Sequence, residues 1–297
     1  MTRSDSVDPH SLASAPVVVG VDGTEASDAA VRWAATAAAR RQRELVIVHG
    51  MDLDTDGFAV RSREQTTAIG ESIVTEATRL AEQTDSAAPA ITPRLESGDP
   101  GQLLVDCSES AHLVVLGGPT DSLGIGRLGS ILLSVVSRAR GAVVVVRAGE
   151  SQAAPSAPVV VGIDGSPVSD AATGVAFREA AVASAPLIAV HSWADPYAGR
   201  FSRLLAASDE PVDVSAPDRA LLAERLAGWR ERYPSVDLQR RVERGTPRDQ
   251  LLSWSQTARL LVVGSRGHGR FARFMLGSTS ATLVQRAKCP VMVVHPG

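Results

Sequence analysis

A glycine- and arginine-rich segment near the end of the chain is suited to hold an anion. It begins Gly264-Ser265-Arg266-Gly267-His268-Gly269 and ends Gly277-Ser278-Thr279. Glycines let backbone N–H groups approach a ligand closely, and the second stretch offers free N–H groups and hydroxyls at the start of a helix expected over 278–286. Positive charge around this point comes from Arg266, His268, Arg270 and Arg273. The pattern favours a phosphate-binding loop over the alternative, a mobile glycine loop with solvated arginines.

Two aspartates lie where parallel strands would end. Asp22-Gly23-Thr24 and Asp164-Gly165-Ser166 each follow a short Val-rich run. Thr24 and Ser166 could cap the next helix, in which case the motif is only a strand-to-helix turn. Alternatively, Asp22 and Asp164 project over the sheet edge to bind a sugar hydroxyl or to approach a metal on phosphate. The sequence leaves both readings open.

Other reactive side chains are better explained by structural roles. His49 and His191 end equivalent apolar runs, and capping a strand is favoured over edging a pocket. Cys107 and Cys289 form no CxxC pair, which favours buried structural thiols in a reducing compartment.

Motifs for other nucleotide chemistry are absent or misplaced. Gly124-Ile-Gly126-Arg-Leu-Gly129 spells GxGxxG, but it does not directly follow a strand, as a dinucleotide-binding motif should. The chain has no GxxxxGK[ST] sequence. No carboxylate pair lies in the loops to serve as a base or to hold a metal, so we expect no catalytic residue, no resident metal, and at most slow hydrolysis of a bound phosphate ligand.

The chain contains the same domain twice. Ala15–Gly23 (APVVVGVDG) returns as Ala157–Gly165 (APVVVGIDG), and Leu45–His49 returns as Leu187–His191. Gly129-Ser130 likewise matches Gly277-Ser278. We therefore predict a first domain over 1–148, a small and polar linker over 149–156, and a second domain over 157–297.

Each half alternates buried strands with helices. Runs such as VVVGV and AVVVV are apolar at consecutive positions, as in strands covered on both faces. Expected strands are 16–21, 44–49, 91–96, 112–117 and 142–147, then 158–163, 186–191, 236–243, 259–264 and 290–295. Helical composition is clear over 25–41 and 217–232. The predicted fold class is α/β, with two tandem Rossmann-like domains, each a five-stranded parallel sheet flanked by helices whose ligands gather at the carboxyl ends of the strands.

The second half resembles the universal stress protein family of ATP-binding type. Gly264-x2-Gly267-x9-Gly277-Ser278 matches the family signature Gly-x2-Gly-x9-Gly-Ser/Thr, after the fourth strand of a unit that opens Val-Gly-Ile-Asp164-Gly-Ser. The resemblance covers nearly the whole chain, and the fold of that family is adenine nucleotide alpha hydrolase-like. It implies that ATP, alone or with Mg²⁺, is the ligand.

The resemblance also implies site residues. In the second domain they are Gly162, Asp164 and Val190 beside the adenosine, and Gly264, Ser265, Arg266, Gly267, His268, Gly269, Gly277, Ser278 and Thr279 around the phosphates. Their weaker counterparts in the first domain are Gly20, Asp22, Val48, Gly117, Gly118, Gly129 and Ser130.

The first half departs from the signature. Aligned without gaps, Leu116 stands in the place of Gly264 and Pro119 in the place of Gly267. A shift of one residue lets Gly117 and Gly118 replace the first glycine, although Pro119 still removes an N–H donor. Positive charge is also scarcer between 121 and 127 than in the second loop. We therefore predict that the second site binds ATP more tightly.

Composition excludes several classes of partner. The chain of 297 residues has 30 Lys and Arg against 33 Asp and Glu, a net charge of −3, and only 4% aromatic residues. Neither a basic surplus for nucleic acid nor a stacking platform for bases is present. No apolar run is long enough to span a membrane, so we expect a cytoplasmic protein.

Two functional hypotheses follow, from different classes. The favoured one is an ATP-binding stress-response regulator whose ligand alters its conformation or assembly. The alternative is a nucleotide-independent interaction module with vestigial sites, supported by the altered first loop. Duplication also predicts an internal pseudo-dimer, through the strands AVVVV and PVMVV, and allows a homodimer. The segment 193–216 is either a flap over the site or an ordinary variable loop.

Overall fold

The computed structural model describes residues 14–52, 63–85, 90–118, 129–149, 154, 156–193, 216–267 and 276–296. The chain forms two compact units. The first contains residues 1–151, 272–276 and 292–297, and the second contains residues 152–271 and 277–291. Both units alternate strands with helices, so the predicted α/β class is confirmed.

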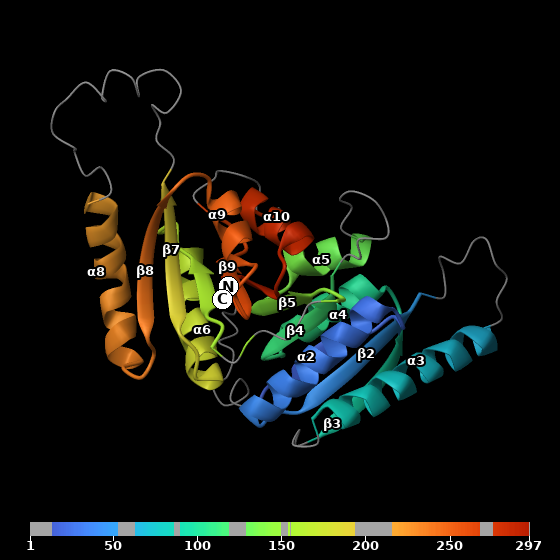
Figure 1. Cartoon of the computed structure of the whole chain (residues 1–297). Coiled ribbons are helices and arrows are strands. Elements are labelled where there is room, and N and C mark those ends of the chain that lie inside the picture. The colour runs from blue at the N-terminus through green and yellow to red at the C-terminus, as the bar shows by residue number, and fades with distance from the viewer. Residues whose placement is uncertain are drawn as a thin grey trace, which may run out of the picture. The chain divides into compact units, whose positions relative to one another are not determined.

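The first unit is a parallel sheet in the order β3-β2-β1-β4-β5. Its strands are β1 (Val17–Gly20), β2 (Leu45–Met51), β3 (Ile91–Ser97), β4 (Leu113–Gly117) and β5 (Ala142–Val146). Its helices are α2 (Glu25–Arg41), α3 (Arg63–Thr84), α4 (Pro100–Ser108) and α5 (Ser130–Arg138). Helix α2 packs beside α3, and α4 packs beside α5 (Figure 1).

The second unit repeats this arrangement. Its strands β6 (Val159–Gly162), β7 (Leu187–Trp193), β8 (Leu238–Arg244) and β9 (Leu260–Gly264) are parallel in the order β8-β7-β6-β9. Its helices are α6 (Pro167–Ala183), α8 (Ala216–Arg232), α9 (Pro247–Trp254) and α10 (Ser278–Arg286). The last strand is β10 (Val291–Val294).

Strand order reverses at one place in each sheet. From β1 the chain moves outward through β2 and β3, then returns to add β4 on the other side of β1, and β6 and β9 are related in the same way. In α/β proteins, ligands gather at the carboxyl ends of the strands where the strand order reverses in this way. The turn after β6 and the loop after β9 therefore face a common position.

Consecutive valines form the core because both faces of the central strands are covered. Val17 and Val19 are fully buried, and Val18 on the opposite face is only 3% exposed. In the second unit the whole of Val159–Val161 is also buried. Such strands leave polar chemistry only to the turns at their ends.

The helices begin at side-chain caps in four cases. Thr24, Asp99, Ser166 and Thr246 each accept a hydrogen bond from the backbone N–H three residues later. Such a cap satisfies one of the N–H groups that lack an intrahelical partner. These four helices are α2, α4, α6 and α9. Helices α5 and α10 instead begin after a glycine and have no side-chain cap.

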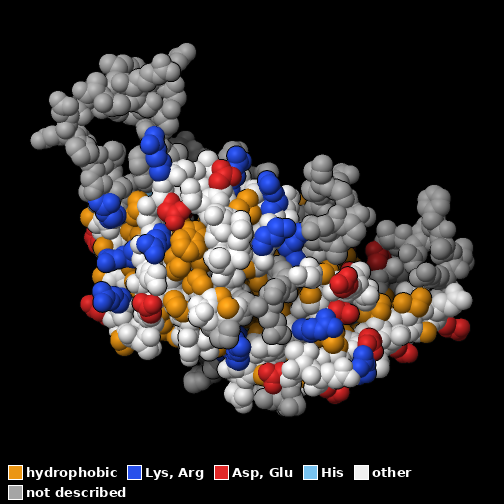
Figure 2. Space-filling model, in the orientation of Figure 1, with side chains coloured by type: hydrophobic (Ala, Val, Ile, Leu, Met, Phe, Trp, Pro, Cys, Tyr) orange, Lys and Arg blue, Asp and Glu red, His pale blue; other side chains and the backbone are white. Residues whose placement is uncertain are grey.

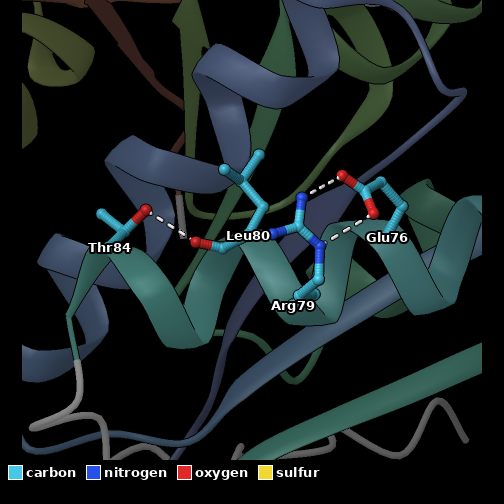
Figure 3. Close-up of polar contacts among 4 residues, drawn as sticks. All are labelled: Glu76, Arg79, Leu80 and Thr84. Atoms are coloured by element: carbon cyan, nitrogen blue, oxygen red, sulfur yellow. Dashed lines mark hydrogen bonds and ion pairs between the residues drawn. The ribbon is translucent and has the colours of Figure 1, made fainter.

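Exposed polar contacts help to hold α3. Arg79 reaches both carboxylate oxygens of Glu76, with 3.0 Å between Arg79 Nε and Glu76 Oε2, and Thr84 Oγ1 donates to Leu80 O at 2.8 Å (Figure 3). The hydrogen bond from Arg79 lowers the pKa of Glu76 below its ordinary value. Both side chains are solvent-exposed, so the pair stabilises the helix only slightly.

An aromatic cluster distinguishes the second unit. The ring of Phe177, fully buried on α6, stacks with Trp229 of α8 at 6.2 Å between centroids and with Tyr233 at 5.7 Å. Gly174 makes room for the indole, because a Cβ there would lie 2.4 Å from Trp229 Cη2. The cluster fixes how α8 packs on α6.

The end of the chain belongs to the first compact unit. His295 is only 8% exposed, and its backbone N–H donates to Gly141 O at 2.8 Å. Its ring nitrogens lie 2.9 Å from Val136 O and 3.2 Å from Gly141 O. These contacts attach His295 to α5, through Val136, and to the turn before β5, through Gly141.

The surface carries charges of both signs. On the face shown in Figure 2, Lys and Arg side chains are interspersed with Asp and Glu side chains. Among the described helices, none is long and apolar enough to cross a membrane.

Candidate functional site

Strand register decides which glycine of the first unit corresponds to Gly264. Val17 pairs with Leu113, and its repeat equivalent Val159 pairs with Leu260. Leu113 therefore corresponds to Leu260, and Gly117, which ends β4, corresponds to Gly264, which ends β9. The ungapped alignment that placed Leu116 at this position is wrong, and the alignment shifted by one residue is right.

The same register changes the rest of the comparison. Gly118 takes the place of Ser265, Pro119 that of Arg266, and Thr120 that of Gly267. Gly129 and Gly277 both stand immediately before a helix, so the first loop is one residue shorter than the second. The signature is therefore retained at its first and last glycines and lost at its middle glycine.

The start of α10 is tied to the end of β9. The Gly277 N–H donates to Ser265 O at 2.8 Å, and Ser280 Oγ donates to Gly264 O at 2.6 Å. Ser280 is buried, so this second contact is shielded from water. The two bonds hold the helix N-terminus directly against the first residues of the glycine loop.

Helix α10 begins without a side-chain cap. Its N-cap residue is Gly277, and the first intrahelical bond runs from Ala281 N–H to Gly277 O at 2.9 Å. The backbone N–H groups of Ser278, Thr279 and Ser280 thus lack intrahelical acceptors. Four other helices fill this position with a hydroxyl or carboxylate, whereas α10 and its repeat equivalent α5, which starts after Gly129, do not. An uncapped N-terminus suits an anion, because its N–H groups and the helix dipole both favour negative charge.

Asp164 brings the β6–α6 turn to the glycine loop. Its Oδ1 accepts the Ser166 N–H at 2.9 Å, and its own N–H donates to Ser169 Oγ at 3.2 Å. The other oxygen, Oδ2, lies 2.4 Å from the position that a Cβ on Gly267 would occupy. A side chain at 267 would force this carboxylate to move, so glycine allows the loop to lie close to Asp164 as it does here.

Ser265 carries a buried hydroxyl with no partner. The residue is 3% exposed, and within the described residues its Oγ is the buried side-chain oxygen that makes no hydrogen bond. Leaving such a group unsatisfied costs roughly 1–3 kcal/mol. A hydroxyl in this state between Gly264 and Arg266 is available to a ligand.

Asp22 in the first unit makes the same backbone contact as Asp164 and accepts one further hydrogen bond. Asp22 Oδ1 accepts both the backbone N–H of Thr24, at 3.0 Å, and its hydroxyl, at 2.6 Å. Gly117 approaches the backbone of α2, since a Cβ there would lie 2.7 Å from the carbonyl carbon of Ala26. Thr120, which takes the place of Gly267 in the sequence, lies outside the described residues.

The start of α5 is also less polar than that of α10. Ser130 repeats Ser278, but the next residue is Ile131, 41% exposed, where α10 has Thr279. The Gly118 N–H donates to Val146 O at 2.6 Å, which removes one donor from this edge. Among the described residues, the start of α5 therefore offers fewer polar groups than the start of α10.

Four residues expected near the adenosine contribute to the packing of the core. Gly20 and Gly162 make room for leucine side chains, because a Cβ would lie 2.9 Å from Leu104 Cδ1 or 2.8 Å from Leu251 Cδ1 respectively. Val48 and Val190 are both 2% exposed, so only their backbones could face a ligand.

The paired histidines cap the neighbouring strand. His49 Nδ1 lies 2.7 Å from Val21 O, and His191 Nδ1 lies 2.8 Å from Ile163 O. A carbonyl can only accept, so Nδ1 carries the hydrogen in both rings. This is the capping arrangement that the sequence favours.

The cysteines are not placed for chemistry in this crevice. Cys289 is buried, and burial together with the nearby Glu96 carboxylate raises the pKa of the Cys107 thiol above its ordinary value. No group of three or more His, Cys, Asp or Glu side chains that could hold a metal occurs in the described part of the chain. The expected site residues His268 and Gly269, with Arg270 and Arg273, lie outside the described residues.

The sequence of the chain matches a known protein family in both halves. The model of the universal stress protein family matches residues 15–147 and again residues 156–295. The chain belongs to the universal stress protein family. The family is thus present twice, as two tandem domains.

Related universal stress proteins have the same extent. One from Mycolicibacterium smegmatis is 38% identical over 303 residues, covering 94% of this chain and 97% of its own. One from Mycobacterium tuberculosis is 39% identical over 290 residues, covering 94% and 96%. The crystal structure of a universal stress protein from Archaeoglobus fulgidus is 18% identical and superposes with a TM-score of 0.72, over 95% of this chain and 98% of that one. The fold of this universal stress protein is therefore that of its family over nearly its whole length.

Two contributors to the site were not identified from the sequence. Ser280 ties α10 to β9, and Ser169 accepts the Asp164 N–H. Both are ordinary helix residues in the sequence, and the only signal is a hydroxyl within the first turns of a helix that follows a glycine-containing loop. Such a signal is common to many caps and identifies no site alone.

Proposed function

We propose that this universal stress protein binds ATP at the crevice between β6 and β9, and that the bound nucleotide regulates its conformation or assembly. The observation that carries the proposal is the uncapped N-terminus of α10, held against the end of β9 beside the unpartnered Ser265 hydroxyl. N–H groups from one helix turn and a buried hydroxyl together suit the oxygens of a phosphate chain.

The turn after β6 supports a position for the nucleoside end of the nucleotide. Asp164 Oδ2 faces the loop at Gly267 and can accept a hydrogen bond from a ribose hydroxyl. Arg266 adds positive charge beside the phosphates. The site thus has donors for the anion and an acceptor for the sugar, which supports a nucleotide over inorganic phosphate.

The two units are proposed to differ in affinity. Thr120 replaces Gly267, Ile131 replaces Thr279, and Gly118 replaces the hydroxyl of Ser265. These differences support a second role for the first unit as an interaction module that does not depend on nucleotide. One chain would then combine a nucleotide sensor with a partner surface, as an internal pair of domains or in a homodimer.

Calorimetric titration of ATP into the full chain tests the proposal, with and without Mg²⁺. We expect one tight site per chain, and any second site at least tenfold weaker. Hydrogen exchange should show slower exchange at residues 277–283 when ATP is bound. A folded, nucleotide-free chain that gives no heat and no change in exchange would refute ATP binding, while binding without any change in exchange beyond the site would refute the regulatory part.

A further inference from the structure

An arginine of α8 lies against the turn that carries Asp164. A Cβ on Gly165 would be 3.2 Å from Arg225 Cζ and 3.3 Å from Arg225 Nη2. Gly165 has φ of +87°, a conformation that side-chain-bearing residues rarely adopt, so the backbone there is open to close approach. The Arg225 guanidinium therefore rests on the residue next to Asp164.

The packing of α8 fixes this placement. Trp229, one turn after Arg225, fits over Gly174 and donates from Nε1 to Asp170 Oδ1 at 3.3 Å. Residues four apart share one face of a helix, and long side chains point toward its N-terminus. The Trp229 anchor thus directs Arg225 toward the N-terminal end of α6, where Asp164 and Gly165 lie.

Packing alone does not explain an arginine here. In the first unit the same contact is made by Ile73, whose Cγ1 lies 3.2 Å from the Cβ position of Gly23. Arg225 is exposed, and in the described residues it makes no hydrogen bond or ion pair. Its N–H donors are therefore available to a ligand. The N-terminal end of α6 carries the positive end of the helix dipole, so the dipole does not stabilise a cation at this position.

The strand order shows which part of a nucleotide would meet this arginine. The phosphates are assigned to the β9–α10 side, and moving along the sheet edge from β9 leads to β6 with Asp164 and then to β7. Neighbouring strands are roughly 5 Å apart, so two steps cover about 10 Å, within the reach of an extended nucleotide. A ligand lying along this edge brings its nucleoside past Asp164 to the Arg225 side.

We propose that Arg225 is a recognition residue for the purine-and-ribose end of the ligand, an inference that rests on the proposed ATP site. Its planar guanidinium can stack on a purine ring or donate to its ring nitrogens. Ile73 offers neither interaction in the first unit. Arg225 thereby favours the second unit for nucleosides as well as for their phosphates.

The test measures three ligands on the full chain and on Arg225→Ile, which installs the residue of the first unit. ATP and adenosine should each bind about tenfold more weakly to the variant, while tripolyphosphate affinity should stay within twofold. Arg230→Ile, on an exposed arginine of the same helix, is the matched control and should change none of the three affinities.

Each other outcome is decisive. An Arg225→Ile protein with unchanged adenosine affinity, or one that loses only tripolyphosphate affinity, overturns the inference and leaves the ATP site standing. Failure of the unaltered chain to bind ATP refutes the proposed function instead, and the inference falls with it. If Arg225→Ile does not fold, as judged by its unfolding transition, Arg225→Gln keeps the aliphatic stem and must show the same selective losses.

Discussion

Replacing Gly277 with aspartate should slightly stabilise the protein and at the same time weaken ATP binding roughly 100-fold. Gly277 has φ −60° and ψ 147°, which any residue can adopt, and a Cβ there would meet its nearest atoms, Arg266 Cα and Ser265 O, at 3.4 Å. The substitution therefore fits without displacing the loop. Its carboxylate would accept an N–H of the first turn of α10, as Asp99 does on α4.

The two effects have opposite signs and separate magnitudes. Because glycine is itself a tolerated N-cap residue, aspartate in its place should raise the free energy of unfolding by only roughly 0.3 kcal/mol. In the complex, the carboxylate would occupy N–H groups that phosphate needs and would lie ~5 Å from it. At an effective dielectric constant of about 40, each pair of unit charges at that distance repels by about 1.7 kcal/mol, so two nearby phosphate charges cost about 3 kcal/mol. This corresponds to roughly 100-fold weaker binding.

Calorimetry and denaturant unfolding on the full chain measure the two effects. Gly129→Asp is the matched control, because Gly129 holds the same position before α5 and a Cβ there has no neighbour within 4 Å. It should give a similar gain in stability and leave the tight ATP site unchanged. If Gly277→Asp is more stable but binds ATP as the unaltered chain does, the α10 N-terminus is not the phosphate site.

Three further changes test other parts of the structure. Ser265→Ala removes a buried hydroxyl that has no hydrogen-bond partner, so the free energy of unfolding should not fall. ATP affinity measured by calorimetry should fall about fivefold. A clear loss of stability would contradict the absence of a partner for this hydroxyl. Phe177→Ala should lower the unfolding free energy in urea by about 3–5 kcal/mol, and a loss under 1 kcal/mol would show that the aromatic cluster is not a core element. Burial raises the pKa of the Cys107 thiol, so less of it is ionised than in a free cysteine. Iodoacetamide should therefore react more slowly with Cys107 than with glutathione at pH 8, and equal rates would contradict the shift.

Much of the fold could be predicted because its elements have local signatures. Consecutive valines at 17–19 and 159–161 required strands buried on both faces, and the Ala-rich stretch 25–41 became α2 with the predicted bounds. The segment 278–286 likewise became α10. The duplication supported these assignments independently, because each half repeats the order of strands and helices of the other.

Alignment of the two halves could not be settled from the sequence. Leu113–Gly117 reads LVVLG and Leu260–Gly264 reads LLVVG, so shifting one against the other by a residue preserves their apolar character. Only pairing with β1 and β6 fixes the register, and that pairing depends on the whole sheet. The choice between Leu116 and Gly117 therefore required the structure.

The arrangement around Asp164 also depends on tertiary contacts. Asp22 and Asp164 lie in nearly identical sequences, yet Asp22 binds the Thr24 hydroxyl whereas Asp164 faces Gly267. Gly267 lies about a hundred positions after Asp164 in the chain, so no local pattern predicts this contact. Arg225 is placed through Trp229 and Gly174, and no local pattern links Gly174 on α6 to the two residues on α8.

The central claim, that one chain holds one ATP in its second unit, is tested most directly by the nucleotide released from purified, denatured protein and quantified by mass spectrometry. The account predicts adenine nucleotide approaching one equivalent per chain from the unaltered protein and from Gly129→Asp, and almost none from Gly277→Asp. Equal nucleotide content in the two variants, or release that is lost only with Gly129→Asp, would contradict it.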